Sequence, residues 1–204
     1  MIIPLFPLES GLFPGGLISL RIFEIRYLEM IKKAIKNKSS FGLVMLKKGN
    51  EVRKAGVLEE FMPVGTIAEI IEINTLQPTL ILIRCLGKKR FRLLSHERVK
   101  YGLWQGEVEI IEDDVVTKIP PNLQSVADSL GKFISSMQQR GLSLDKMPIQ
   151  PPFRLTESGW VSNRWAELLS INVFSRQKLL EERCPNIRLE KVAEYLSNSP
   201  GSYR

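Results

Sequence analysis

The sequence predicts an α+β protein in which an antiparallel β-barrel or sandwich with one embedded helix precedes a small helical bundle. Three observations support this prediction. Several short apolar or alternating segments occupy the first 112 residues, and only one helical pattern interrupts them. An acidic pair and two prolines then mark a boundary, beyond which apolar residues recur at helical spacing. We therefore predict a β-rich domain over residues 1–114 and a helical domain over residues 115–204.

Short strands are expected throughout the first domain. The last of them alternates regularly between apolar and polar residues, as a half-buried strand does. In the middle of the domain, Ile67, Ile71 and Ile73 are expected to share one face. Proline donates no backbone hydrogen bond, so Pro4 and Pro7 indicate that the first strand is irregular or lies at an edge. The expected strands span residues 2–8, 41–46, 65–73, 80–86, 91–94 and 103–112.

Helical spacing marks one helix in the first domain and several in the second. Residues 23–36 carry a single apolar stripe, and residues 123–140 carry another. Ser175 is expected to cap a short helix nearer the C-terminus, and the tail 197–204 is expected to fray. The stripe of the first helix consists of Phe23, Tyr27, Met30, Ile31 and Ala34.

Composition points to a cytoplasmic protein that does not associate with membranes. No apolar run approaches the ~18 residues that span a bilayer, and the N-terminus lacks the basic segment of a signal peptide. Cys85 and Cys184 lack a second cysteine or a histidine at metal-ligand spacing, so we expect two reduced thiols and no metal or cofactor. The net charge of +7 belongs to residues 1–100, which carry 17 Lys and Arg against 9 Asp and Glu.

The sequence also argues against an enzyme. His96 is the single histidine and lies in a polar stretch, where a surface loop is the expected setting. No GxSxG, GxxxxGK[ST] or GxGxxG motif is present to supply a nucleophile or to hold a phosphate. Adjacent carboxylates such as Glu59 and Glu60 lie in solvated stretches. We predict a non-catalytic protein, with a carboxylate or thiol enzyme as the remaining alternative.

The most specific signal is an ordered set of short motifs. The chain opens with Pro4-Leu5-Phe6-Pro7-Leu8, turns at Phe13-Pro14-Gly15-Gly16 and continues through Leu20-Arg21-Ile22-Phe23-Glu24-Ile25-Arg26-Tyr27. Glu24 is a candidate ion partner for the arginines of that last motif. Val64-Gly65-Thr66-Ile67-Ala68, Gly87-Lys88-Lys89-Arg90-Phe91-Arg92 and Gln177-Lys178-Leu179-Leu180-Glu181 follow. In this order the motifs resemble the N-terminal substrate-binding domain of the ATP-dependent Lon proteases, from Ile2 to Leu196.

The resemblance implies a PUA-like β-domain followed by a helical part. It departs in detail: the family usually has proline where this chain has Ser19 and Ile25. The chain stops at Arg204 without a Walker motif, so by resemblance it is a stand-alone bacterial version of the domain. Its implied partners are unfolded or flexible polypeptides, a protease or chaperone system, and a second copy in a homo-oligomer. The family supplies no catalytic residue.

A peptide-binding surface needs apolar anchors with charges or backbone edges at its rim. Exposure of Phe153 is favoured by the rigid proline-rich loop that precedes it. The alternative is that the tryptophans pack between the two domains and that Tyr27 fills the core. The candidate residues for peptide binding are Arg26, Tyr27, Trp104, Phe153, Trp160 and Trp165.

A basic cluster supports a second hypothesis, RNA binding by the positively charged first half. On a regular strand, Lys88, Arg90 and Arg92 would share one face and could contact phosphates. However, aromatic residues are not interleaved with them as a stacking platform. A solvated or ion-paired strand face is the simpler interpretation, and we expect polypeptide rather than RNA partners.

Overall fold

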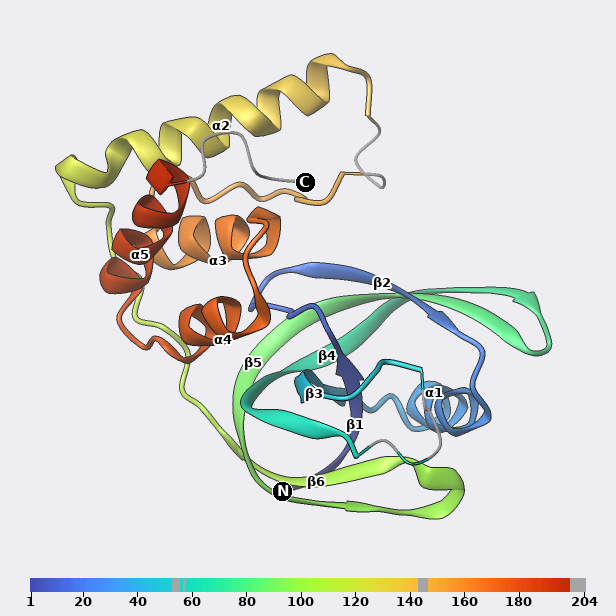
Figure 1. The fold of residues 1–204 in the computed structure, drawn as a ribbon. Coiled ribbons are helices and arrows are strands. Elements are labelled where there is room, and N and C mark those ends of the chain that lie inside the picture. The colour runs from blue at the N-terminus through green and yellow to red at the C-terminus, as the bar shows by residue number, and fades with distance from the viewer. Residues whose placement is uncertain (53–55, 57, 143–146, 199–204) are drawn as a thin grey trace. The chain divides into compact units, whose positions relative to one another are not determined.

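The computed structural model describes residues 1–52, 56, 58–142 and 147–198 (Figure 1). The chain forms two compact units, Met1–Asp113 and Asp114–Arg204, which we describe separately. The tail was expected to fray over residues 197–204, and residues 199–204 of it lie outside the described residues.

Among the described residues of the first unit, six strands form one mixed sheet. The sheet order is β2-β5-β4-β3-β1-β6, and β6 also pairs with β5, so the sheet curls back on itself in a sandwich-like way. This arrangement confirms the predicted α+β class. The strands are β1 (Ile2–Leu8), β2 (Leu17–Ile22), β3 (Phe41–Lys48), β4 (Glu60–Gln77), β5 (Leu80–Arg98) and β6 (Trp104–Ile110).

The sequence suggested an antiparallel sheet, but the sheet is mixed. Strands β1 and β3 run parallel, with Leu5 opposite Gly42 and Leu8 opposite Met45. A parallel pair needs a long crossover connection. Strand β2 and helix α1 (Ile25–Asn37) provide it, because they lie between β1 and β3 along the chain.

The prolines of β1 do not place this strand at an edge; it lies between β3 and β6. Met1 and Val108 exchange backbone hydrogen bonds of 2.9 and 2.7 Å. Because the direction of backbone groups alternates along a strand, the odd residues of β1 direct their N–H and C=O groups toward β6, and the even residues direct theirs toward β3. Pro4 thus faces β3 one residue before that pairing begins, and Pro7 faces β6 two residues after that pairing ends at Leu5. Each missing N–H falls where the ladder is not formed.

Strand β5 is one continuous element of 19 residues, where the sequence suggested two strands. It continues through Gly87 because this glycine permits a close approach: an added Cβ would lie 2.2 Å from the carbonyl oxygen of Phe13. Strand β2, which the sequence analysis did not predict, pairs along the first half of β5 from Leu17 opposite Leu86 to Ile22 opposite Ile81.

The inward face of β4 differs from the predicted isoleucine face. Thr66 and Ala68 are buried, whereas Ile71 and Ile73 are nearly half exposed. A register shift between Ile70 and Glu72 breaks the alternation, and β4 extends beyond the last residue that pairs with β3. Nearer the centre of the sheet, the ring of Phe91 packs against Gly65 so closely that an added Cβ would lie 2.4 Å from its Cζ.

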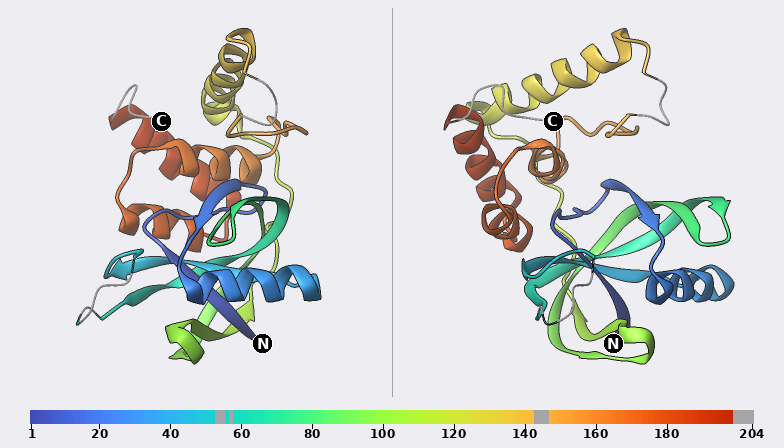
Figure 2. Two further views of the ribbon diagram at one scale, coloured as in Figure 1. Left: turned by 90° about the vertical axis from the view of Figure 1, so that its right-hand side faces the viewer. Right: turned by 45° about the vertical axis from the view of Figure 1, so that its right-hand side comes forward.

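Helix α1 buries the predicted stripe against one side of the curled sheet (Figure 2). Tyr27, Met30, Ile31 and Ala34 are buried, as predicted. Phe23 is an exception, being 52% exposed, because the helix begins only at Ile25.

The second unit contains the helices α2 (Gln124–Gln139), α3 (Ser158–Leu168), α4 (Val173–Glu181) and α5 (Pro185–Asn198). The cap of α4 is Asn172, whose side chain accepts a hydrogen bond from the N–H of Ser175, so the prediction of Ser175 as the cap was wrong. Buried Arg188 ties the unit together: it donates two hydrogen bonds to Asp114, of 2.6 and 3.1 Å, and one of 3.0 Å to the carbonyl oxygen of Leu179.

The close packing at Gly65 leads to a stability prediction. We expect Gly65→Ala to lower the free energy of unfolding by about 1–3 kcal/mol, because the added methyl group overpacks the contact with Phe91 and the Leu43 carbonyl. Gly131→Ala is the control: it adds a methyl group in a helix, where the nearest atom is the end of the flexible Leu155 side chain at 3.3 Å, and should stabilise by about 0.5–1 kcal/mol. Denaturant titration followed by circular dichroism measures both changes; equal effects would contradict the prediction.

Candidate binding groove

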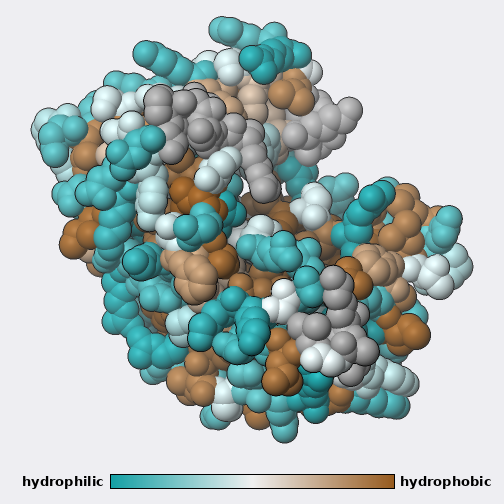
Figure 3. Space-filling view, in the orientation of Figure 1, coloured by the Kyte–Doolittle hydropathy of each residue, from teal (hydrophilic) through white to brown (hydrophobic). Residues whose placement is uncertain are grey.

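A groove of about 340 Å³ opens on the first unit between β2, the end of β1 and the start of α1. Its walls combine apolar and aromatic side chains with a few charged ones, as in many ligand sites. Apolar side chains reach the surface at the end of the first unit that holds β2 and α1 (Figure 3). The groove is lined by Phe6, Leu8, Ser10, Ile18, Ser19, Leu20, Arg21, Phe23, Glu24, Tyr27, Glu51 and Val52.

The lining shows that the groove follows the edge of β2. Successive side chains of a strand point to opposite faces of the sheet. Four consecutive residues of β2, 18–21, line the groove, so it cannot lie on one face alone. Strand β5 occupies one edge of β2, and β2 ends the sheet order. The groove therefore lies along the opposite edge, with Phe6 and Tyr27 across from it.

Charged side chains beneath the groove form a buried ion cluster. Arg26 pairs with Glu24 at 3.0 Å, which confirms Glu24 as an ion partner, and its Nη1 lies 3.9 Å from Oε1 of Glu59. The other oxygen of Glu59 accepts hydrogen bonds from Arg98 at 3.3 Å and from the indole N–H of Trp104. Burying Arg26 and Glu59 away from water is costly unless opposite charges and hydrogen bonds lie close to each of them, as they do here. The cluster fixes the start of α1 relative to the β5–β6 connection.

Tyr27 stands at the junction of the groove and this cluster. Its ring lies 4.1 Å from that of Phe6, and the guanidinium of Arg26 lies 4.5 Å from its centre. Burial raises the pKa of the Tyr27 phenol well above its ordinary value of 10.0, so the phenol stays protonated. Its hydroxyl is buried, and within the described part of the chain it has no hydrogen-bond partner. Such a group is a donor that a bound ligand or water can satisfy.

The structure brings three of the sequence-predicted peptide-binding residues together. Tyr27 lines the groove, and Arg26 forms an ion pair with Glu24, which also lines it. Trp104 is connected to this cluster by its hydrogen bond to Glu59. Trp104 is itself buried, packed against Phe61 with ring centres 5.1 Å apart.

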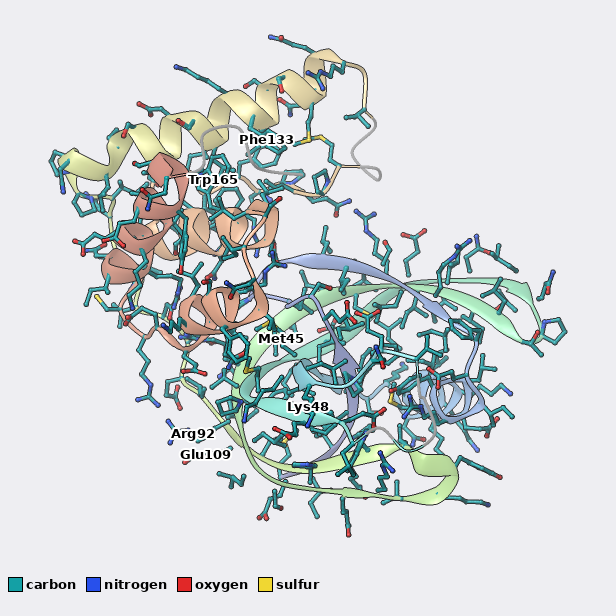
Figure 4. The ribbon with its side chains drawn as sticks, in the orientation of Figure 1. Met45, Lys48, Arg92, Glu109, Phe133 and Trp165 are labelled. Carbon is teal, nitrogen blue, oxygen red and sulfur yellow. The ribbon has the colours of Figure 1, made fainter. Side chains whose placement is uncertain are left out.

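The other three candidates lie in the second unit. Phe153 and Trp160 are partly exposed and pack edge to face at 6.5 Å. Trp165 is 1% exposed; it donates to the carbonyl oxygen of Val126 and lies against Phe133 of α2, so it belongs to the core of that unit (Figure 4).

Several residues of the groove were not singled out from the sequence. Glu51 and Val52 carry no motif, and only the folding of β2 beside the loop at 51–52 brings them to the groove. Glu59 was assigned to a solvated stretch, yet it is buried. In the sequence, the arginines and aromatic residues of β5 and β6 are the one indication that Glu59 has partners, and they do not identify which residues these are.

The basic residues do not form the single face expected of them. Arg90 is only 4% exposed, whereas Lys88 and Arg92 are exposed. The physical reason is a β-bulge: the register of β4 with β5 shifts by one residue between Thr66 and Ala68, which reverses the alternation. Lys88 pairs with Glu69 at 2.9 Å. Arg92 lies beside Glu109 of the neighbouring strand (Figure 4).

Neither Cys85 nor His96 lines the groove. Burial raises the pKa of the Cys85 thiol to about 12, so it is scarcely ionised at neutral pH. His96 lies in β5 rather than in a loop, with its ring 5.2 Å from that of Trp104. Over the described ranges, no three His, Cys, Asp or Glu side chains are grouped to hold a metal ion. No helix in this part of the chain has both the length and the apolar composition needed to cross a bilayer.

Comparison with known proteins identifies the fold. The chain is 28% identical to a Lon N-terminal domain protein from Xanthomonas campestris, with a TM-score of 0.73 over 95% of this chain and 98% of the other. The N-terminal domain of a Mycobacterium avium complex Lon protease, 12% identical, shares the fold with a TM-score of 0.60 over 97% and 99% of the two chains.

Sequence comparison extends this result to a family. The model of the ATP-dependent protease La (LON) substrate-binding domain matches residues 2–198, so the chain belongs to that family. Lon proteases of Aquifex aeolicus and Anaeromyxobacter dehalogenans are 28% and 21% identical over 97% and 96% of the chain. The chain spans about a quarter of the length of these relatives, 25% and 23%.

The buried ion cluster leads to a test of what holds the groove in shape. Glu59→Ala should lower the free energy of unfolding by about 3 kcal/mol, because it leaves Arg98 and the indole N–H of Trp104 without their buried acceptor. The neighbouring substitution Glu60→Ala is the control, since the pair of Glu60 with Lys47 is exposed and should contribute less than about 1 kcal/mol. Chemical denaturation measures both, and a mild effect at Glu59 would mean that the cluster is not essential.

Proposed function

We propose that this chain binds unfolded or flexible polypeptides and does not catalyse a reaction on them. The observation that carries the proposal is a groove with an apolar and aromatic floor along a sheet edge, in a member of a substrate-binding domain family. Flexible polypeptides expose both apolar side chains and unpaired backbone groups. A groove beside a strand edge complements both kinds of group.

Each part of the groove has a role in this proposal. Phe6, Leu20 and Tyr27 form a floor for apolar side chains. Phe23 adds an exposed aromatic ring at the rim, where it can fold over a bound segment. The proposal assigns the ion cluster beneath the groove to structure rather than to chemistry, since its charges compensate one another.

Phe153 and Trp160 are proposed as a second apolar contact for the same clients, on the helical unit. Their edge-to-face packing leaves part of each ring accessible. Because the curated relatives are Lon proteases, we also propose that the bound polypeptides are handled by a proteolytic system in the cytoplasm.

Phe23→Ser provides the test. We expect it to weaken the binding of a fluorescently labelled, reduced and alkylated lactalbumin about tenfold, because an exposed aromatic anchor is lost while the core is untouched. Fluorescence anisotropy measures the affinity. Phe174→Ser is the matched control, since Phe174 is 53% exposed against 52% for Phe23 and lies in α4 of the other unit. Equal affinities of both variants and the original chain would exclude the groove, and no binding by any of them would exclude the function.

A further inference from the structure

Among the described residues, no strand occupies one edge of β2. Within this part of the chain, β2 ends the sheet order and pairs only with β5. A sheet edge presents a row of N–H and C=O groups, and proteins commonly cover such a row or use it to bind another strand. Which residues of β2 present these groups depends on how β2 is aligned with β5.

A G1-type bulge at the start of β2 sets this alignment. Gly15, with φ of 73°, donates to the carbonyl oxygen of Gly87, and Gly87 donates to Gly16, both at 2.8 Å. Counting on from Gly16, alternate residues face β5, so Ile18 and Leu20 direct their backbone groups to that strand. Leu17, Ser19 and Arg21 direct theirs to the outer edge. No hydrogen bond in the described structure reaches these outward groups.

The outward backbone groups and the groove coincide. Ser19 and Arg21 are exposed, and both line the groove. A strand added beside β2 would lie about 4.8 Å away, within the groove. Its alternate side chains would then point toward the floor formed by Phe6, Leu20 and Tyr27. An extended polypeptide segment satisfies both the backbone row and the apolar floor, whereas a helix satisfies only the floor.

The charges at the groove favour one kind of segment. Glu24 is paired with Arg26, and Glu51 accepts a hydrogen bond from the N–H of Glu9 at 2.7 Å. Arg21 has no ion-pair partner among the described residues. Arg21 is exposed and lines the groove, so its guanidinium is free to pair with a carboxylate on a bound segment.

We propose that an extended client segment joins the sheet as an additional strand along β2. The segment has apolar side chains at alternate positions and an acidic side chain among the others. This inference rests on the proposed function and specifies its binding mode. Residues 69–77 of β4 pair with β5 on one edge, and no described strand occupies their other edge, but none of these residues lines the groove.

Backbone methylation tests the binding mode directly. The probe is a labelled nine-residue peptide of alternating valine and polar residues with one aspartate, together with two versions N-methylated at the odd or at the even residues. Because only alternate N–H groups of an added strand face β2, one version should bind at least tenfold more weakly and the other should bind like the parent. Equal binding of the two versions would overturn the proposal.

Proline substitution tests it from the side of the protein. Ser19→Pro removes an outward N–H that β5 does not use, and should weaken peptide binding about tenfold. Thr75→Pro is the matched control: opposite Ile81 on β5, Thr75 also directs its backbone groups outward, but on the edge of β4 away from the groove. Circular dichroism verifies that both variants fold. If the Ser19→Pro variant does not fold, the methylated peptides provide the test.

These experiments distinguish a failure of the proposed function from a failure of the proposed binding mode. Absence of any peptide or client binding by the original chain would exclude the proposed function. Binding that is unchanged by Ser19→Pro and by methylation would leave that function intact and overturn strand addition. Self-association of the original chain in sedimentation, abolished by Ser19→Pro, would assign the edge to a second copy of the chain and would also overturn the proposal.

Discussion

The contact of Gly87 with the Gly15–Gly16 turn is the interaction on which the arrangement of the first unit depends. Two backbone hydrogen bonds of 2.8 Å join the turn to β5, and only glycine fits at position 87, because any Cβ there would meet the Phe13 carbonyl. This contact aligns β2 with β5 and thereby decides which backbone groups of β2 face outward. It also lets β5 continue past the turn to pair with β4 and β6. The curled sheet, the groove and the orientation of the edge all follow from it.

The ion cluster joins the start of α1 to the sheet beside the groove. Arg26 and Glu59 are buried and belong to different segments, the start of α1 and the residue before β4. Their mutual compensation, with Arg98 and Trp104, keeps α1 close to the sheet and gives the groove a fixed wall. A rigid groove beside an open edge binds a flexible chain at a smaller cost in ordering than a surface that must itself fold. This is the physical reason to connect a substrate-binding domain with strand addition.

Local patterns in the sequence predicted much of this fold. The stripe of α1, the strands at 2–8 and 41–46, and the Phe13–Gly16 turn depend on neighbouring residues, and these the sequence specifies directly. The parallel pairing of β1 with β3 could not be predicted in this way, because it depends on how the intervening β2 and α1 cross over. The bulge that buries Arg90 is likewise set by the partner strand. For the same reason Glu59, whose partners Arg98 and Trp104 are 39 and 45 residues away, carried no signal, although the nearby pair of Arg26 with Glu24 did.

Amide hydrogen exchange measured by NMR, with and without a saturating client peptide, shows whether the outer edge of β2 receives the client. We expect the outward amides of Ser19 and Arg21 to exchange rapidly in the unbound chain and to become protected when the peptide is added. The amides of Ile18 and Leu20 already pair with β5 and should change little. Protection that appears elsewhere in the chain while the amides of β2 stay unchanged would contradict the claim that this edge receives the client.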